Sequence, residues 1–176
     1  AEFIEGDMQA LDFPDNHFDV AVCAFGIFFV EDMVSQLSSI ARLVKPGGKI
    51  AITCFQENYF SPQKDMLFKS LADHGVQLPP QTWRLIADED GCGKLFQDAG
   101  LKQIRIEKKN AGYFLNNSSE WWDVVWNAGY RRMVGQIAPE DRENFKREHL
   151  REIDTLITSE GIWLDVGILI AEGIKS

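Results

Sequence analysis

Two short segments carry residues that could bind a ligand, and each directly follows a strand pattern. Gly6-Asp7-Met8 comes after the apolar pair Phe3-Ile4, and Ala24-Phe25-Gly26 ends the apolar run that begins at Phe18. In a parallel sheet, ligands bind at the carboxyl ends of the strands. The sequence therefore predicts binding chemistry at these two segments.

The elements that position these segments form a strand, helix, strand pattern. Buried-strand patterns run from Phe18 to Ala24 and from Lys49 to Phe55, and an amphipathic segment with Asp32 as its N-cap lies between them. This alternation is typical of a parallel sheet and predicts the α/β fold class. Pro46-Gly47-Gly48 precedes a strand, whereas a phosphate-binding loop follows one, so we expect a turn without a ligand there.

Composition limits the classes of partner. A chain of 176 residues with 45% apolar and 11% aromatic residues can build one sizeable core. The net charge of −9 argues against nucleic acid or an anionic membrane as the main partner. Cys23, Cys54 and Cys92 show neither metal-ligand spacing nor an even disulfide framework, which favours a reducing cytoplasm and predicts no metal. We find no signal peptide and no long apolar span.

The histidines are weak candidates for acid-base chemistry. His17 and Asp19 lie near the amino end of a strand, remote from the expected site. His149 shares a helical apolar stripe with Phe145, so a packed histidine is expected there. His74 lies at a helix stop, and we assign no catalytic base to the chain.

A longer series of motifs runs through the first fifty residues. In order, it consists of Gly6-Asp7, Leu11, Phe13-Pro14-Asp15, Phe18-Asp19 and Leu43-Val44-Lys45-Pro46-Gly47-Gly48. Each piece alone is weak, but the order and spacing together are specific. The series resembles the class I S-adenosylmethionine-dependent methyltransferases, especially the small-molecule type of ubiquinone and menaquinone biosynthesis.

The resemblance implies a cofactor and the residues that bind it. The cofactor is S-adenosylmethionine, with S-adenosylhomocysteine as the product. Asp7 would accept a hydrogen bond from the adenine amino group, and the backbone of Met8 would meet the adenine ring. Ala24, Phe25 and Gly26 would line the cleft near the methionine part and the transferred methyl group. The alternative for Asp7 is that it only caps the following turn.

The residues after the strand at Phe18 also bear on the acceptor. Methyltransferases that act on amide or nucleobase nitrogen carry an Asp or Asn, two prolines and an aromatic residue at this position, whereas this chain has Ala24-Phe25-Gly26-Ile27. This departure argues against a DNA base or a protein glutamine as the acceptor. Phe25, Phe28 and Phe29 either add to an apolar wall for the substrate or belong to the core.

The resemblance implies a Rossmann-like class I methyltransferase sheet with helices on both faces. The segments 18–24, 49–55, 162–175 and 101–109 would lie side by side in that order, and the last two would form an antiparallel pair. Phe3-Ile4 would be the end of a further strand. The first two strands of the family's sheet are apparently missing, including the strand that ends in the glycine-rich cofactor loop.

Three explanations account for the missing strands. The chain starts at Ala1 and not at methionine, so we expect that upstream sequence is missing and the chain is truncated. Alternatively, it pairs its exposed strand edges with another copy as a homodimer, or it is a truncated protein that binds no cofactor. The first is favoured because bare strand edges promote aggregation.

We expect one partial methyltransferase domain over residues 1–176, with substrate-side or cap elements at 57–100 and 111–160. Asn117 and Glu120 have capping-box spacing and open a tryptophan-rich helix. This helix either lines part of a substrate pocket or buries its rings.

The leading functional hypothesis is methyl transfer from S-adenosylmethionine to a small, partly apolar acceptor. Positioning and desolvation can carry much of such a displacement, so a catalytic base is not required. One rival is a non-catalytic methyltransferase-like module that associates through open sheet edges. The other is a nicotinamide dehydrogenase with the same sheet type, which the motif order disfavours.

Overall fold

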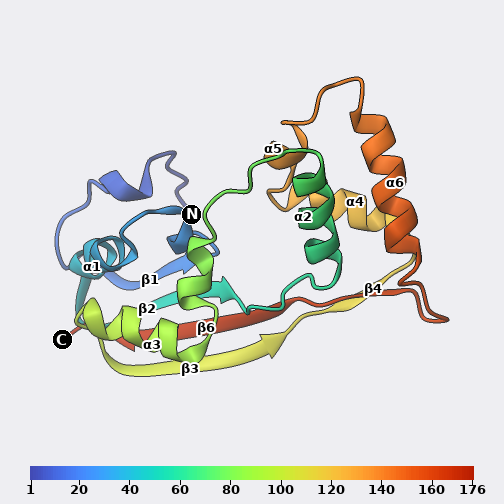
Figure 1. Cartoon of the computed structure of the whole chain (residues 1–176). Helices are drawn as coiled ribbons and strands as arrows, with labels where there is room; N and C mark the ends of the chain where they lie inside the picture. Colours follow the sequence, from blue (N-terminus) through green and yellow to red (C-terminus); the bar gives the residue numbers. More distant parts are fainter. The chain divides into compact units, whose positions relative to one another are not determined.

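The computed structural model describes all residues from 1 to 176, and the chain divides into two compact units (Figure 1). Unit 1 contains residues 1–57, 81–109 and 168–176, and unit 2 contains residues 58–80 and 110–167. Each unit is therefore built from segments that are far apart in the sequence.

Unit 1 is a four-stranded sheet with helices, and its strands lie in the order β1-β2-β6-β3. Its elements are η1 (Met8–Ala10), β1 (Phe18–Ala24), η2 (Ile27–Phe29), α1 (Met33–Leu43), β2 (Val44–Phe55), η3 (Thr82–Ile86), α3 (Glu89–Asp98), β3 (Lys102–Asn110) and β6 (Gly167–Ile174), where η marks a 3-10 helix. This is the order that the resemblance implied for these four strands. The predicted α/β fold class is confirmed.

The parallel pair β1 and β2 is joined by α1, as the strand, helix, strand pattern predicts. Cys23 lies opposite Ile52 in this pair. The side chain of Asp32 begins the helix by accepting a hydrogen bond from the backbone N–H of Ser35 at 2.9 Å. Such a bond satisfies an N–H that has no partner within the helix, so the predicted N-cap is confirmed.

The two α-helices of unit 1 pack on one face of the sheet. Ile52 of β2 is fully buried in a core that also contains Leu37 from α1 and Phe96 from α3. Full burial of a side chain such as Leu37 contributes about 1.5–3 kcal/mol. On the opposite face of β1, Val20 and Val22 are 53% and 65% exposed. The helices expected on both faces are therefore present on one, and the other face is open along β1.

The strand predicted at Phe3-Ile4 is wrong. Residues 1–7 have no regular secondary structure, and Phe3 is 94% exposed. A strand needs a neighbour for its backbone N–H and C=O groups. Because β1 is an edge strand that pairs with β2 alone, no neighbouring strand holds this segment.

The glycine turn expected before the second strand is also different. β2 begins at Val44, so Pro46-Gly47-Gly48 lies within the strand. The backbone N–H of Gly47, at φ +79°, donates to the carbonyl of Lys175 at 2.9 Å. The positive φ and the register shift between β1 and β2 at this point show that the three residues form an irregular, bulged part of the strand.

The long strand expected over residues 162–175 is divided into two. β5 (Ile162–Leu164) pairs with β4 (Tyr113–Leu115) in a separate antiparallel sheet, while β6 joins the sheet of unit 1. Between them, Oδ1 of Asp165 accepts a hydrogen bond from the N–H of Gly167 at 2.9 Å. This local turn is typical of aspartate and interrupts the strand.

Unit 2 combines helices with the small β4-β5 sheet. Its helices are α2 (Gln63–Asp73), α4 (Ser118–Asn127), α5 (Arg131–Val134) and α6 (Arg142–Asp154). The fully buried Trp121 donates its indole N–H to Nε2 of His149 at 2.9 Å. Of the tryptophans of α4, Trp121 therefore belongs to the interior, whereas Trp126 is 44% exposed.

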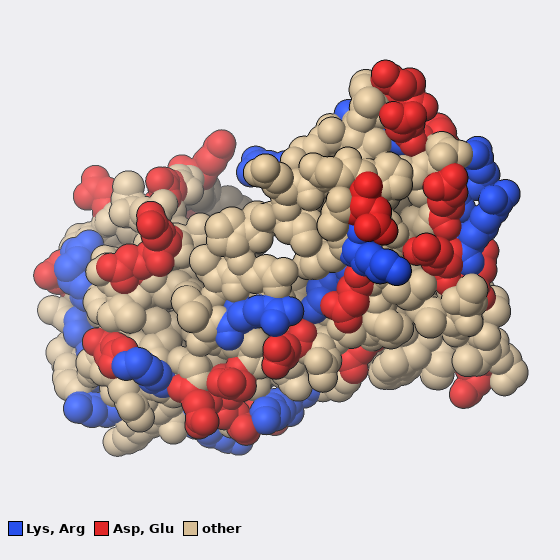
Figure 2. Space-filling model, viewed as in Figure 1, with Lys and Arg blue, Asp and Glu red and all other residues tan.

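The segments expected on the substrate side fall in both units. Residues 81–100 lie in unit 1, where Phe96 is part of the core, and residues 111–160 lie in unit 2. On the face shown in Figure 2, acidic and basic side chains are interspersed. None of the helices has the length and apolarity needed to cross a bilayer.

Candidate functional site

The carboxyl end of β1 has an unusual backbone conformation. Phe25, the first residue after the strand, has φ +51°, in the left-handed region that non-glycine residues rarely adopt. Its backbone N–H donates to the carbonyl and to Oγ1 of Thr53 at 3.1 and 3.0 Å. Such a conformation costs about 1–3 kcal/mol and is concentrated at functional sites. Hydrogen bonds to β2 therefore hold the chain in a strained turn where binding was predicted.

Gly26 brings the second predicted segment to the same place. A Cβ atom on Gly26 would lie 3.9 Å from Sδ of Met8 and 3.2 Å from Sγ of Cys23. Met8 and Gly26 are thus neighbours although eighteen positions separate them in the sequence. A Cβ atom there would be in ordinary contact with Met8 and tight only against Cys23, so the approach of the two segments does not itself require glycine.

Gln36 of α1 fixes the Met8 segment, and the sequence analysis missed it. Its Nε2 donates to the carbonyl of Met8 at 2.6 Å, and the residue is only 5% exposed. The available signal was a polar residue beside Met33 and Leu37 on the apolar side of the helix. A buried amide requires a partner, and here the partner is the backbone of the predicted site.

Asp7 caps the turn that follows it, which is one of the two roles predicted for this residue. Its Oδ1 accepts a hydrogen bond from the backbone N–H of Gln9 at 2.9 Å and begins η1. The residue is exposed, so a ligand can also reach its carboxylate.

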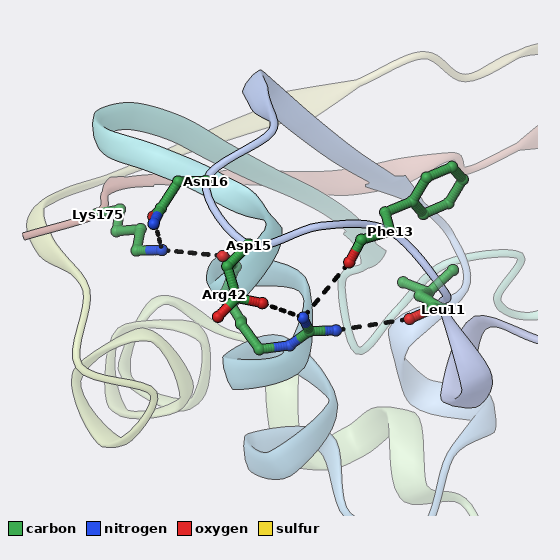
Figure 3. Close-up of polar contacts among 6 residues, drawn as sticks. All are labelled: Leu11, Phe13, Asp15, Asn16, Arg42 and Lys175. Carbon is green, nitrogen blue, oxygen red and sulfur yellow. Dashed lines mark hydrogen bonds and ion pairs between the residues drawn. The ribbon is translucent and has the colours of Figure 1, made fainter.

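Arg42 anchors the loop between η1 and β1 to helix α1 (Figure 3). Its Nη1 forms an ion pair with Asp15 and donates to the carbonyl of Phe13 at 3.4 Å. Its Nη2 lies 3.5 Å from the carbonyl of Leu11. One guanidinium group therefore holds three residues of the Leu11 to Asp15 motif.

Lys175 fastens the other end of this loop. Its Nζ donates to Oδ1 of Asn16 at 2.9 Å and to the carbonyl of Arg42 at 3.0 Å (Figure 3). Arg42 and Lys175 thus fasten the loop between Met8 and β1 to α1 and to the C-terminal segment.

The titratable side chains of β1, Cys23 and Asp19, lie in surroundings typical of structural residues and not of catalytic ones. Burial raises the pKa of the Cys23 thiol, so it remains protonated at neutral pH. Asp19 lies near the opposite end of the strand, where a hydrogen bond from Lys45 at 2.7 Å lowers the pKa of its carboxyl. The expected structural role of Asp19 agrees with this contact.

The aromatic residues that follow β1 differ in how far they are buried. The Phe25 ring lies 4.7 Å from the ring of Phe55, and Phe28 is 8% exposed and belongs to the core. Phe29 is 79% exposed. The core interpretation therefore holds for Phe28, while Phe29 faces solvent.

The histidines do not gather at this site. His17 is exposed, and His74 contacts the carbonyl of Ser70 within unit 2 through Nδ1 at 2.8 Å. His149 is buried and bonded to Trp121, and burial lowers its pKa to about 4. The prediction that His149 is a packed residue is confirmed.

Comparison with known proteins shows which class of protein this chain resembles. Residues 1–52 match a family model described as a methyltransferase domain. The fold is similar to that of a methyltransferase-like protein from an antibiotic biosynthesis pathway of Anabaena variabilis, with a TM-score of 0.59, 14% identity, and coverage of 98% of this chain and 72% of that one. The predicted resemblance to the class I S-adenosylmethionine-dependent methyltransferases is confirmed.

Curated relatives narrow the resemblance within this class. The chain is 28% identical over 127 residues to the ubiquinone/menaquinone biosynthesis C-methyltransferase UbiE of Shewanella halifaxensis, and 30% identical over the same length to that of Shewanella sediminis. Each match covers 62% of this chain and 49% of the relative. The chain thus resembles the UbiE type and spans about half the length of these relatives.

Proposed function

We propose that this chain provides part or all of an enzyme that transfers the methyl group of S-adenosylmethionine to a small, partly apolar acceptor. The observation that carries the proposal is the convergence of Met8 and Gly26 at the carboxyl end of β1. Both residues lie within the segment that matches the methyltransferase domain model. The relatives named above are C-methyltransferases of ubiquinone and menaquinone biosynthesis, which supports a small-molecule acceptor.

The residues at this end of β1 have the chemistry to hold the cofactor. When bound, S-adenosylmethionine would supply an electrophilic methyl group. Asp7 has an exposed carboxylate that can accept a hydrogen bond from the adenine amino group. The backbone of Met8 would lie against the adenine ring, and Ala24, Phe25 and Gly26 would line the site near the methyl group. Gln36 and the turn at Phe25 would keep these groups in place before the ligand binds.

Calorimetric titration with S-adenosylhomocysteine tests this assignment. We expect binding by the folded chain and about tenfold weaker binding by Asp7→Ser, because hydrogen bonds to charged groups contribute about 1.5–3 kcal/mol. Serine keeps an oxygen that can cap η1 but is too short to serve a ligand. Asp12→Ser, at an exposed position of the same loop, is the matched control. Equal binding by wild type and Asp7→Ser would refute the role of Asp7, and no binding by the folded chain would show that it does not hold the cofactor by itself.

A second candidate function is a non-catalytic module that forms a homodimer through the open edge of the sheet at β1. The supporting observation is the edge strand β1, where Val20 and Val22 are 53% and 65% exposed. Edge strands with exposed apolar residues pair readily with another chain.

The mass of the protein in solution tests this candidate. We expect a dimer for the wild type and a monomer for Val22→Lys, while Ile157→Lys, a matched change at a residue that is 54% exposed in unit 2, should remain a dimer. A monomeric wild type at high concentration would rule out the association.

The partner and the cellular location of the enzyme are part of the proposed function. Its partner is a small-molecule substrate rather than nucleic acid or a membrane, in keeping with the net charge of −9. A cytoplasmic location is proposed because the three cysteines are unpaired.

A further inference from the structure

Unit 2 contains a cavity whose lining residues take no part in the proposed methyl-transfer site. Its volume is about 590 Å³, within the range of about 300–1,000 Å³ that is usual for small-molecule sites. It lies between the β4-β5 sheet and helix α4, and all of its lining residues belong to unit 2.

One side of the cavity is apolar and aromatic. Tyr113 lies opposite Leu164 in the antiparallel pair, and Leu115 follows two positions after Tyr113, so the three side chains share one face of the small sheet. Leu115 and Leu164 are each 1% exposed, whereas Tyr113 is 51% exposed. Phe60 also lines the cavity. The exposed surface on this side comes mainly from the ring of Tyr113, which the buried leucines support, and this ring can contact an apolar or aromatic group.

The α4 side of the cavity carries two carboxylates. Glu120 and Asp123 are three positions apart and therefore neighbours on the helix surface. Both oxygens of Glu120 accept hydrogen bonds from Asn116, from its backbone N–H at 2.8 Å and from its Nδ2 at 2.7 Å. These bonds fix the carboxylate and lower its pKa, so it is ionised at neutral pH.

No positive charge balances this pair, because no lysine or arginine lines the cavity. The site therefore combines an apolar wall with two neighbouring negative charges. A ligand complementary to it has an apolar body and a cationic end.

We propose that this cavity binds a small amphiphilic amine, whose apolar body contacts the β4-β5 face and whose protonated amino group contacts Glu120 and Asp123. The inference stands on the geometry of unit 2 alone. It does not depend on methyl transfer or on the cofactor residues of unit 1.

Two probes of matched shape test the proposal by calorimetric titration of the full chain. Phenylbutylamine carries an aromatic ring, a short chain and a protonated amine, and phenylbutanoate differs mainly in its negative end group. We expect the amine to bind and the carboxylate to bind at least about tenfold more weakly, because like charges are unfavourable in the same site. Equal binding of the two probes, or no binding of the amine by the folded chain at millimolar concentration, would overturn the proposal.

Variants locate the binding. Asp123→Asn should weaken amine binding about two- to fivefold, the usual range for an exposed ion pair. Glu120→Gln should have a similar effect while its amide oxygen still accepts the backbone N–H of Asn116. Glu140→Gln, at an exposed position of unit 2 outside the cavity, should bind the amine like wild type. If Asp123→Asn and Glu120→Gln both fold and bind the amine as tightly as Glu140→Gln, the amine does not occupy this cavity.

Discussion

The buried pair of Trp121 and His149 makes the stability of unit 2 dependent on pH. Nε2 of His149 accepts the indole N–H at 2.9 Å, so Nδ1 carries the proton, and Nδ1 has no hydrogen-bond partner. The side chain is 1% exposed, and this burial lowers its pKa from 6.5 to about 4. A charged imidazole is therefore disfavoured in the folded protein.

The size of the effect follows from this pKa difference. Between about pH 6.5 and about pH 4, the unfolded chain binds a proton that the folded protein does not, so stability falls as the pH falls. Each unit of pKa difference corresponds to about 1.36 kcal/mol. The contribution of His149 lost between about pH 7.5 and about pH 5 is then about 2 kcal/mol, and the loss approaches about 3 kcal/mol below about pH 4.

Urea unfolding of wild type and His149→Gln at both pH values measures this contribution. Glutamine offers an acceptor to Trp121 but does not titrate, so the variant should lose about 2 kcal/mol less than wild type over this interval. Tryptophan fluorescence follows unit 2, because it contains four of the five tryptophans. His17→Gln, which removes an exposed histidine of unit 1, is the control and should behave like wild type. An equal loss of stability in wild type and His149→Gln would refute the reasoning.

Three further predictions concern unit 1. In the folded protein a thiol reagent should modify Cys23 alone, because Cys54 and Cys92 are fully buried. The sulfur atoms of Cys54 and Cys92 lie 3.5 Å apart, and this contact raises the pKa of Cys54. Mass spectrometry of the labelled protein checks the prediction, and fast labelling of Cys54 would contradict it. Arg42→Met should lower the free energy of urea unfolding by about 1 kcal/mol, through lost hydrogen bonds to the loop before β1, and unchanged stability would argue against the anchor. Gly173→Ala should lower the free energy of unfolding by about 1–3 kcal/mol in the same assay, because the new Cβ atom would lie 2.8 Å from the ring of Phe96 in α3. A neutral effect would mean that this contact relaxes easily.

Local patterns in the sequence predicted much of unit 1. The apolar run from Phe18 to Ala24 matches β1 in both bounds, and Asp32 caps α1 as its position before an apolar stripe indicated. The helical spacing around His149 likewise predicted a buried side chain. These features depend on residues within a few turns of one another, which is the range over which sequence periodicity is informative.

Features that depend on distant partners were not predictable in the same way. Phe3-Ile4 has the composition of a strand, but composition does not show whether a neighbouring strand exists. The bond from Gln36 to Met8 and the carboxylate pair beside the β4-β5 sheet each require contacts between segments that the sequence pattern does not connect. The cofactor roles of Asp7 and of Ala24, Phe25 and Gly26 came from the family resemblance and stay predictions.

The position of β6 in the sheet has a consequence for synthesis on the ribosome. This strand lies between β2 and β3, yet it is translated about sixty residues after β3 and is followed closely by Lys175, which fastens the loop before β1. Until β6 emerges, β2 has no partner on one side, and the apolar core of unit 1 lacks Leu169 and Ala171. The nascent chain must therefore keep two unpaired strand edges soluble while unit 2 is being made, which is the interval in which a chaperone has most to protect.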